Sequence, residues 1–115
     1  MNDLIDLRDR MRQFTDERGW AQFHDPKSLA LALVGEVGEL AELLQWLPAD
    51  TAREALTTEP LSTRVAEEIS DVLLYLVRLA DVLEIDLTSS ALQKLGAAES
   101  RFPIDEVYDS APTKH

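Results

Sequence analysis

Apolar side chains recur at the spacing of an α-helix over four segments of this chain, and glycine or proline ends three of them. The first segment displays the period with Leu4, Leu7, Met11 and Phe14. The predicted helices cover residues 3–18, 26–47, 62–85 and 86–101. Gly19 follows the first segment, and Pro48 and Pro103 follow the second and the fourth, because proline cannot continue a helix. The pattern therefore predicts an all-α fold.

The starts of the predicted helices carry residues that cap helix N-termini. Asp25 precedes Pro26, and this pair supplies a side-chain acceptor and a proline at the first helical position. Ser62 is expected to cap the third helix, and either Asp86 or Thr88 opens the fourth. Each helix is thus defined locally, before any tertiary contact is considered.

The length of 115 residues suits one hydrophobic core, and strand signals are few. The chain has only 4 glycines and 5 prolines, and it lacks the Asn-Gly and Asp-Gly pairs of tight hairpins. We expect one domain over residues 1–103, with a polar linker and one helical turn at 49–60. Residues 104–115 are expected to form a C-terminal tail or arm.

The charge of the chain limits its partners. With 22 acidic and 11 basic side chains, the formal net charge is −11, and such a protein repels polyanions. No basic patch is visible, so we expect no nucleic acid polymer and no membrane as a partner. The longest unbroken apolar runs have six residues, at 29–34 and 72–77, and the first residues are acidic. Zero cysteines exclude disulfides and thiolate metal sites, and together these features predict a cytoplasmic protein.

Two of the predicted helices each carry a pair of carboxylates three residues apart. Glu36 and Glu39 lie in the second helix, and Glu68 and Asp71 lie in the third. Residues at this spacing share one face of a helix, so each helix presents two acids to one side. Four carboxylates that face one another repel strongly unless a cation lies among them. Oxygen ligands without histidine or cysteine favour a hard cation, Mg²⁺ or Mn²⁺.

A simpler interpretation of these acids is a solvated face, because an amphipathic helix needs one. In this alternative the protein is a non-catalytic acidic helical oligomer that acts as a nucleotide-binding or protein interaction module. Gly35 and Gly38 favour the metal site, since each costs about 1 kcal/mol relative to alanine within a helix. That cost is explained if a partner helix or a ligand approaches closely beside them.

The second predicted helix is more apolar than one buried face requires. Thirteen of the nineteen residues from Leu29 to Leu47 are apolar or tryptophan. A helix in a small monomer cannot bury so many side chains on one side. The excess predicts a homo-oligomer in which partner chains cover this helix.

Aromatic residues gather around the second predicted helix. Trp20 and His24 precede it, Trp46 ends it, and Tyr75 lies in the third helix. These side chains can stack on a nucleobase, as aromatic residues of single-strand binders do, or they can fill the core and interfaces. A di-iron bundle is excluded, because its Glu-x-x-His motif is absent from a chain whose only histidines are His24 and His115.

Three stretches of the chain together resemble a known family. They are Trp-x-Gln-Phe-His at 20–24, the helix from Leu29 to Trp46, and Glu-x-Ser-Asp-Val-Leu-x-Tyr-Leu-Val at 68–77. The combination resembles the MazG-like all-α nucleoside triphosphate pyrophosphohydrolases, and within them the dCTP pyrophosphatase branch. The paired acids alone are a weak motif, but the aromatic segment and Gln45-Trp46 make the combination specific. The resemblance extends over residues 4–103.

The resemblance implies a four-helix MazG-like bundle that assembles into dimers or tetramers and holds Mg²⁺ with acids from two helices. Such enzymes hydrolyse a (deoxy)nucleoside triphosphate to the monophosphate and pyrophosphate in nucleotide pool clean-up, with dCTP or a modified pyrimidine nucleotide as the first choice here. By motif position the metal ligands are Glu36, Glu39, Glu68 and Asp71. Either Glu36 or Glu39 serves as the catalytic base. The positions around the base and sugar are Trp20, Trp46 and Tyr75.

Two positions depart from the branch, and three basic residues are candidate phosphate contacts. Met11 stands where the branch often has a histidine, and Ala98 stands where an asparagine commonly follows the lysine of the fourth helix. The base preference is therefore left open. Lys94 and Arg101 can contact phosphate or lie on a solvated face. Lys27, near the start of the second helix, can use its charge and the helix dipole to hold a phosphate.

Overall fold

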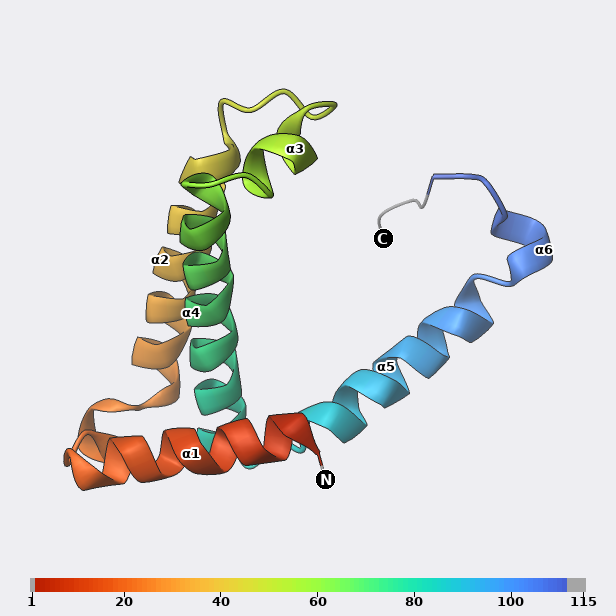
Figure 1. Ribbon diagram of the computed structural model, residues 1–115. Coiled ribbons are helices and arrows are strands. Elements are labelled where there is room, and N and C mark those ends of the chain that lie inside the picture. Colours follow the sequence, from red (N-terminus) through yellow and green to blue (C-terminus); the bar gives the residue numbers. More distant parts are fainter. Residues whose placement is uncertain (1, 112–115) are drawn as a thin grey trace. The chain divides into compact units, whose positions relative to one another are not determined.

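The structure, a computed structural model, describes residues 2–111 as helices joined by short connections (Figure 1). The elements are α1 (Asp3–Glu17), the short 3₁₀ turn η1 (Ala21–Phe23), α2 (Pro26–Leu44), α3 (Ala52–Leu56), α4 (Leu61–Val82), α5 (Leu87–Arg101) and α6 (Ile104–Val107). No strand occurs among the described residues, so the predicted all-α fold is confirmed. None of these described helices is both long and apolar enough to cross a membrane.

Local signals set most helix ends as predicted. Asp25 caps α2 by accepting a hydrogen bond from the backbone N–H of Ser28 at 2.9 Å. Asp86 caps α5 in the same way. After α1 ends, Gly19 adopts a φ of 66°, a left-handed conformation that glycine takes at little cost.

The ends of α4 differ from the prediction. The helix begins at Leu61 without a side-chain cap, and the Ser62 hydroxyl donates to the Glu59 carboxylate instead of capping it. The helix ends at Val82, short of the predicted residue 85. The reason for the early end is that Glu84 takes a φ of 57°, outside the right-handed helical region.

α2 and the C-terminal segment also differ in detail. α2 ends at Leu44 rather than at residue 47. Pro48 has no N–H to donate to the Leu44 carbonyl, which instead accepts from the Leu47 N–H at 3.0 Å in a tighter turn. The helical turn predicted in the linker 49–60 is confirmed as α3. The segment from residue 104, expected as a tail or arm, contains the short helix α6.

α2 and α4 run antiparallel, side by side, and make the most extensive helix contact (Figure 1). The buried apolar side chains lie in this pair, with Leu29 on α2 and Val77 and Ala80 on α4. α1 packs against the C-terminal part of α4, where the Arg12 guanidinium pairs with the Asp81 carboxylate. The pair of α2 and α4 is therefore the scaffold on which the predicted acids are carried.

Contacts divide the chain into two compact units, one up to Ile85 and one from Asp86 onward. The first unit contains η1 and α1 to α4, and the second contains α5 and α6. A four-helix bundle requires α5 to pack beside the other long helices, so the predicted bundle stays a prediction.

An apolar surface of α2 and α4 is exposed on the first unit. Leu31 and Val34 on α2 and Ile69 on α4 are each more than half exposed. Other exposed apolar side chains on these helices are Val37, Leu44, Leu73 and Leu76. An added Cβ at Gly35 or Gly38 would meet no described atom within 4 Å. No described part of this chain therefore approaches closely beside these two glycines, and an approach by a ligand or a partner chain stays a prediction.

Candidate functional site

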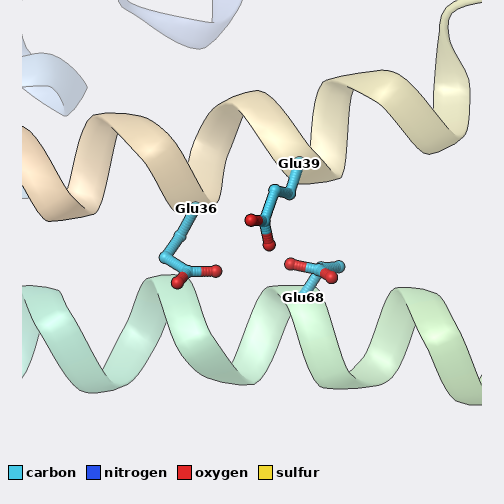
Figure 2. A group of neighbouring side chains, drawn as sticks. All are labelled: Glu36, Glu39 and Glu68. Carbon is cyan, nitrogen blue, oxygen red and sulfur yellow. The ribbon is translucent and has the colours of Figure 1, made fainter.

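Three glutamate side chains converge between α2 and α4 (Figure 2). Glu36 and Glu39 extend from α2 toward α4, and Glu68 extends from α4 toward them. One carboxylate oxygen of each residue lies within 4.8 Å of the other two. The convergence follows from the i, i+3 spacing, which puts both α2 acids on one face, and from the antiparallel helix, which brings Glu68 opposite them. We call this group the acidic cluster.

The acidic cluster is partly shielded from water. One carboxylate oxygen of Glu36 and one of Glu68 are buried and have no hydrogen-bond partner among the described residues. Burial raises the pKa of both groups, and the neighbouring Glu39 raises it further. A buried carboxylate oxygen without a partner is costly, so the arrangement is complete only with a proton or a cation.

Asp71, the fourth predicted ligand, lies at the edge of the acidic cluster. It comes one helical turn after Glu68 on α4, and its negative charge also raises the pKa of Glu36 and of Glu68. Among the described residues, however, the mutually close oxygens come only from Glu36, Glu39 and Glu68. The structure thus brings three of the four predicted ligands together and puts the fourth beside them.

The chemistry of the acidic cluster fits a hard divalent cation. All its donors are carboxylate oxygens, which Mg²⁺ and Mn²⁺ prefer over nitrogen or sulfur. Glu36 and Glu68 are half-buried on the facing sides of two packed helices rather than on solvated faces. A cation among them would satisfy the buried oxygens and cancel the repulsion between the carboxylates.

A cavity of about 480 Å³ adjoins the cluster within the first unit. Its lining residues come from α1, the η1 segment and α4, and are Leu7, Arg10, Met11, Phe14, Thr15, Trp20, His24, Asp71, Leu74 and Tyr75. The rings of Phe14 and Trp20 meet edge to face, with centroids 5.7 Å apart. A volume of this size is typical of small-molecule sites. Asp71 lines the cavity and shares a face of α4 with Glu68, one helical turn away, so the two features are adjacent.

Three of the predicted substrate contacts lie in the cavity lining. Trp20, His24 and Tyr75 come from two elements that are far apart in the sequence and share this one cavity. Met11, which replaces a common histidine of the branch, also lines it. Ala98, the other departure, is half-buried on α5 in the second unit.

The remaining predicted contacts are not among the described residues that line the cavity. Trp46 follows α2 and is 86% exposed, so it is not a core residue of the single chain. Lys27 is exposed in the first turn of α2, where the Asp25 carboxylate already accepts from the backbone N–H of Ser28 and would repel a phosphate. Lys94 and Arg101 are exposed on α5. The roles of these four residues stay predictions.

A buried arginine donates a hydrogen bond to His24, and none of the sequence motifs indicated it. Arg78 is 6% exposed, and its Nε donates to His24 Nδ1 at 3.0 Å. Its guanidinium also pairs with Asp81 at 3.3 Å. Burial lowers the pKa of His24, and the charge of Arg78 lowers it further. Arg78 is the sole charged residue in the helical stretch 72–80, and that isolation is a signal for it.

Thr15 is a second group that the sequence did not indicate. It is fully buried, it lines the cavity, and its hydroxyl has no partner among the described residues. A threonine in an amphipathic helix gives no signal by itself, because its burial depends on how α1 packs against other elements.

Comparison with known proteins identifies a family and several relatives of this chain. Residues 24–103 match the MazG nucleotide pyrophosphohydrolase domain. The chain is 44% identical over 101 residues to dCTP pyrophosphatase 1 of Bos taurus. The aligned residues cover 88% of this chain and 60% of the bovine protein. It is 44% identical over 100 residues to dCTP pyrophosphatase 1 of Homo sapiens, and the aligned residues cover 87% of this chain and 59% of the human protein. The chain thus spans about 60% of the length of these curated relatives.

A solved structure is similar to the chain over nearly its whole length. It is a pyrophosphatase from Archaeoglobus fulgidus, and it superposes with a TM-score of 0.81 at 39% sequence identity. The match covers 90% of this chain and 94% of the archaeal one. The likeness therefore extends from sequence motifs to the fold.

Proposed function

This chain belongs to the MazG nucleotide pyrophosphohydrolase family, and from that premise we propose that it hydrolyses a nucleoside triphosphate to the monophosphate and pyrophosphate. The names of the relatives support the proposal, because two are called dCTP pyrophosphatase 1 and one is called a pyrophosphatase. The reaction breaks the bond between the α and β phosphates with water, so it requires no covalent nucleophile on the protein.

The acidic cluster is the observation that carries the proposal. A triphosphate is strongly anionic and the chain has a net charge of −11, so the two repel each other. Glu36, Glu39 and Glu68, with Asp71 beside them, are the proposed ligands of Mg²⁺, or alternatively of Mn²⁺. When bound, this cation neutralises phosphate charge and withdraws electron density from the attacked phosphorus.

The carboxylates have a second proposed role in activating water. The attacking water must lose a proton, and a carboxylate within hydrogen-bond reach can accept it. Glu36 or Glu39 is the proposed base, because both belong to the cluster that would face the phosphates.

The cavity is the proposed site of the nucleoside. Trp20 and Tyr75 supply flat surfaces on which a base can stack, and His24 supplies a polar edge. We propose dCTP or a modified pyrimidine deoxynucleotide as the preferred substrate, supported by the names of the mammalian relatives. Met11 in the lining changes the polar groups available to the base, so a modified base is included in the proposal.

A homo-oligomer, a dimer or a tetramer, is also proposed. The exposed apolar side chains on α2 and α4 support it, because a surface of this kind is normally covered by a partner. Light scattering at micromolar concentration tests this directly. A mass near the 12.9 kDa of one chain would contradict the oligomer.

The function itself is tested by product analysis. The protein is incubated with a panel of deoxynucleoside triphosphates and Mg²⁺, and the products are separated and identified. Monophosphate with pyrophosphate supports the proposal, and release of single phosphate indicates a different reaction. Binding of nucleotide without any product would support the non-catalytic nucleotide-binding module. The cytoplasmic location expected from the sequence stays a prediction.

A further inference from the structure

We propose that Arg78 is a positioning residue, which orients His24 so that its Nε2–H donates a hydrogen bond to the nucleoside part of the substrate. The inference rests on the proposed function, because it takes the cavity beside the acidic cluster as the nucleoside site. It concerns a contact between residues 54 positions apart in the sequence.

The hydrogen bond between the two side chains determines which ring nitrogen carries the proton. Arg78 Nε donates to His24 Nδ1 at 3.0 Å, and a guanidinium has no acceptor atom. Nδ1 must therefore present a lone pair, and the neutral ring carries its proton on Nε2. A second positive charge beside a buried guanidinium is unfavourable, so the ring stays neutral at physiological pH.

Arg78 is held in one orientation by its own partners. Its side chain is buried, and its guanidinium pairs with Asp81 one turn further along α4. Asp81 in turn accepts a hydrogen bond from Arg12 Nε on α1 at 3.1 Å. Because the guanidinium is buried and paired, it cannot swing away from His24 without leaving Asp81 with one partner fewer.

The consequence is a donor of defined direction in the cavity wall. His24 lines the cavity, and with Nδ1 occupied by Arg78 its free ring nitrogen is Nε2. Trp20 and Tyr75 line the same cavity with flat rings suited to a base. A fixed N–H among these rings favours nucleosides that present an acceptor, such as a pyrimidine carbonyl oxygen, at that position.

The tautomer can be tested by ¹⁵N NMR of the histidines in the full chain, without turnover. The chain has two histidines, and His24→Gln assigns their signals. We expect wild-type His24 to carry its proton on Nε2 at neutral pH, and Arg78→Met to give a mixture of tautomers. Arg12→Met is the matched control, because Arg78 keeps its contact with Asp81 and the wild-type tautomer should persist. A wild-type ring with its proton on Nδ1 overturns the proposal.

Steady-state kinetics test the link to substrate. Arg78→Met should raise KM for the preferred nucleotide about 3- to 10-fold, the effect of one hydrogen bond, with a smaller change in kcat. His24→Gln puts an amide donor near the Nε2 position that does not depend on Arg78. When Arg78→Met is added to the His24→Gln variant, KM should therefore change by less than about 2-fold.

The kinetic comparison distinguishes a positioning role of Arg78 from a purely structural one. If Arg78→Met raises KM equally in the wild type and in the His24→Gln variant, Arg78 is a purely structural residue and the proposal is overturned. If the wild type releases no pyrophosphate from any nucleotide, the proposed function fails instead. The NMR measurement then still reports whether Arg78 sets the His24 tautomer.

Discussion

Glu68→Gln removes one negative charge from the acidic cluster and keeps the size of the side chain. In metal-free protein the oxygens of Glu36, Glu39 and Glu68 repel one another within 4.8 Å, and one Glu68 oxygen is buried without a described partner. A neutral amide removes the part of that repulsion that involves Glu68, so the metal-free variant should be at least as stable as the wild type. With Mg²⁺ present the wild type should be the more stable of the two, because the variant has lost a charged ligand of the cation.

The size of the reversal follows from the linkage between binding and folding. A cation that binds only the folded protein adds about 1.4 kcal/mol of stability for each tenfold rise in its free concentration above Kd. For a domain of this size that is roughly 5 °C in Tm. Oxygens on opposite sides of Mg²⁺ are about 4.2 Å apart, so the cluster needs little movement to bind it. The wild-type Tm should climb with Mg²⁺, and the variant's Tm should stay nearly constant.

Thermal melts across a Mg²⁺ titration, at one protein concentration, measure both effects. Glu67→Gln is the matched control, since it removes the same charge from an exposed neighbouring position on α4 and should follow the wild type. A Glu68→Gln variant that gains as much stability from Mg²⁺ as the wild type would refute the metal site. A large loss of metal-free stability would refute the repulsion argument and give Glu68 a structural role.

Burial and neighbouring carboxylates raise the pKa of Glu36 and Glu68 above the ordinary 4.5, so the folded state holds these protons more tightly than the unfolded chain. Metal-free protein should therefore lose stability as pH rises from 4.5 through the raised values, and urea melts that show no loss would contradict this. Thr15→Val removes a buried hydroxyl that has no partner among the described residues, and it should raise the free energy of unfolding by about 1 kcal/mol. A lower value in the same melts would mean that the hydroxyl is paired. Trp46→Ala should weaken nucleotide binding by roughly 1 to 3 kcal/mol and blur pyrimidine selectivity at unchanged Mg²⁺ affinity. Calorimetric titration checks this, and wild-type affinity and selectivity would leave Trp46 as an interface residue.

Local rules account for what could be predicted from the sequence. The caps at Asp25 and Asp86 and the left-handed Gly19 depend on groups within one helical turn, and the structure has all three. The Ser62 cap was wrong for an equally local reason, because the Glu59 carboxylate three residues earlier accepts its hydroxyl. The i, i+3 spacing of Glu36 and Glu39 likewise put both on one face.

No local pattern in the sequence could predict which helix faces pack against each other. The same acids suited a solvated face or a metal site, and only the antiparallel packing of α2 against α4 brought Glu68 opposite Glu36 and Glu39. The hydrogen bond from Arg78 to His24 likewise required the segment before α2 to pack against α4. Caps and periodicity act within one or two turns of the chain, whereas burial, raised pKa values and long-range hydrogen bonds arise only when separate helices exclude water between them.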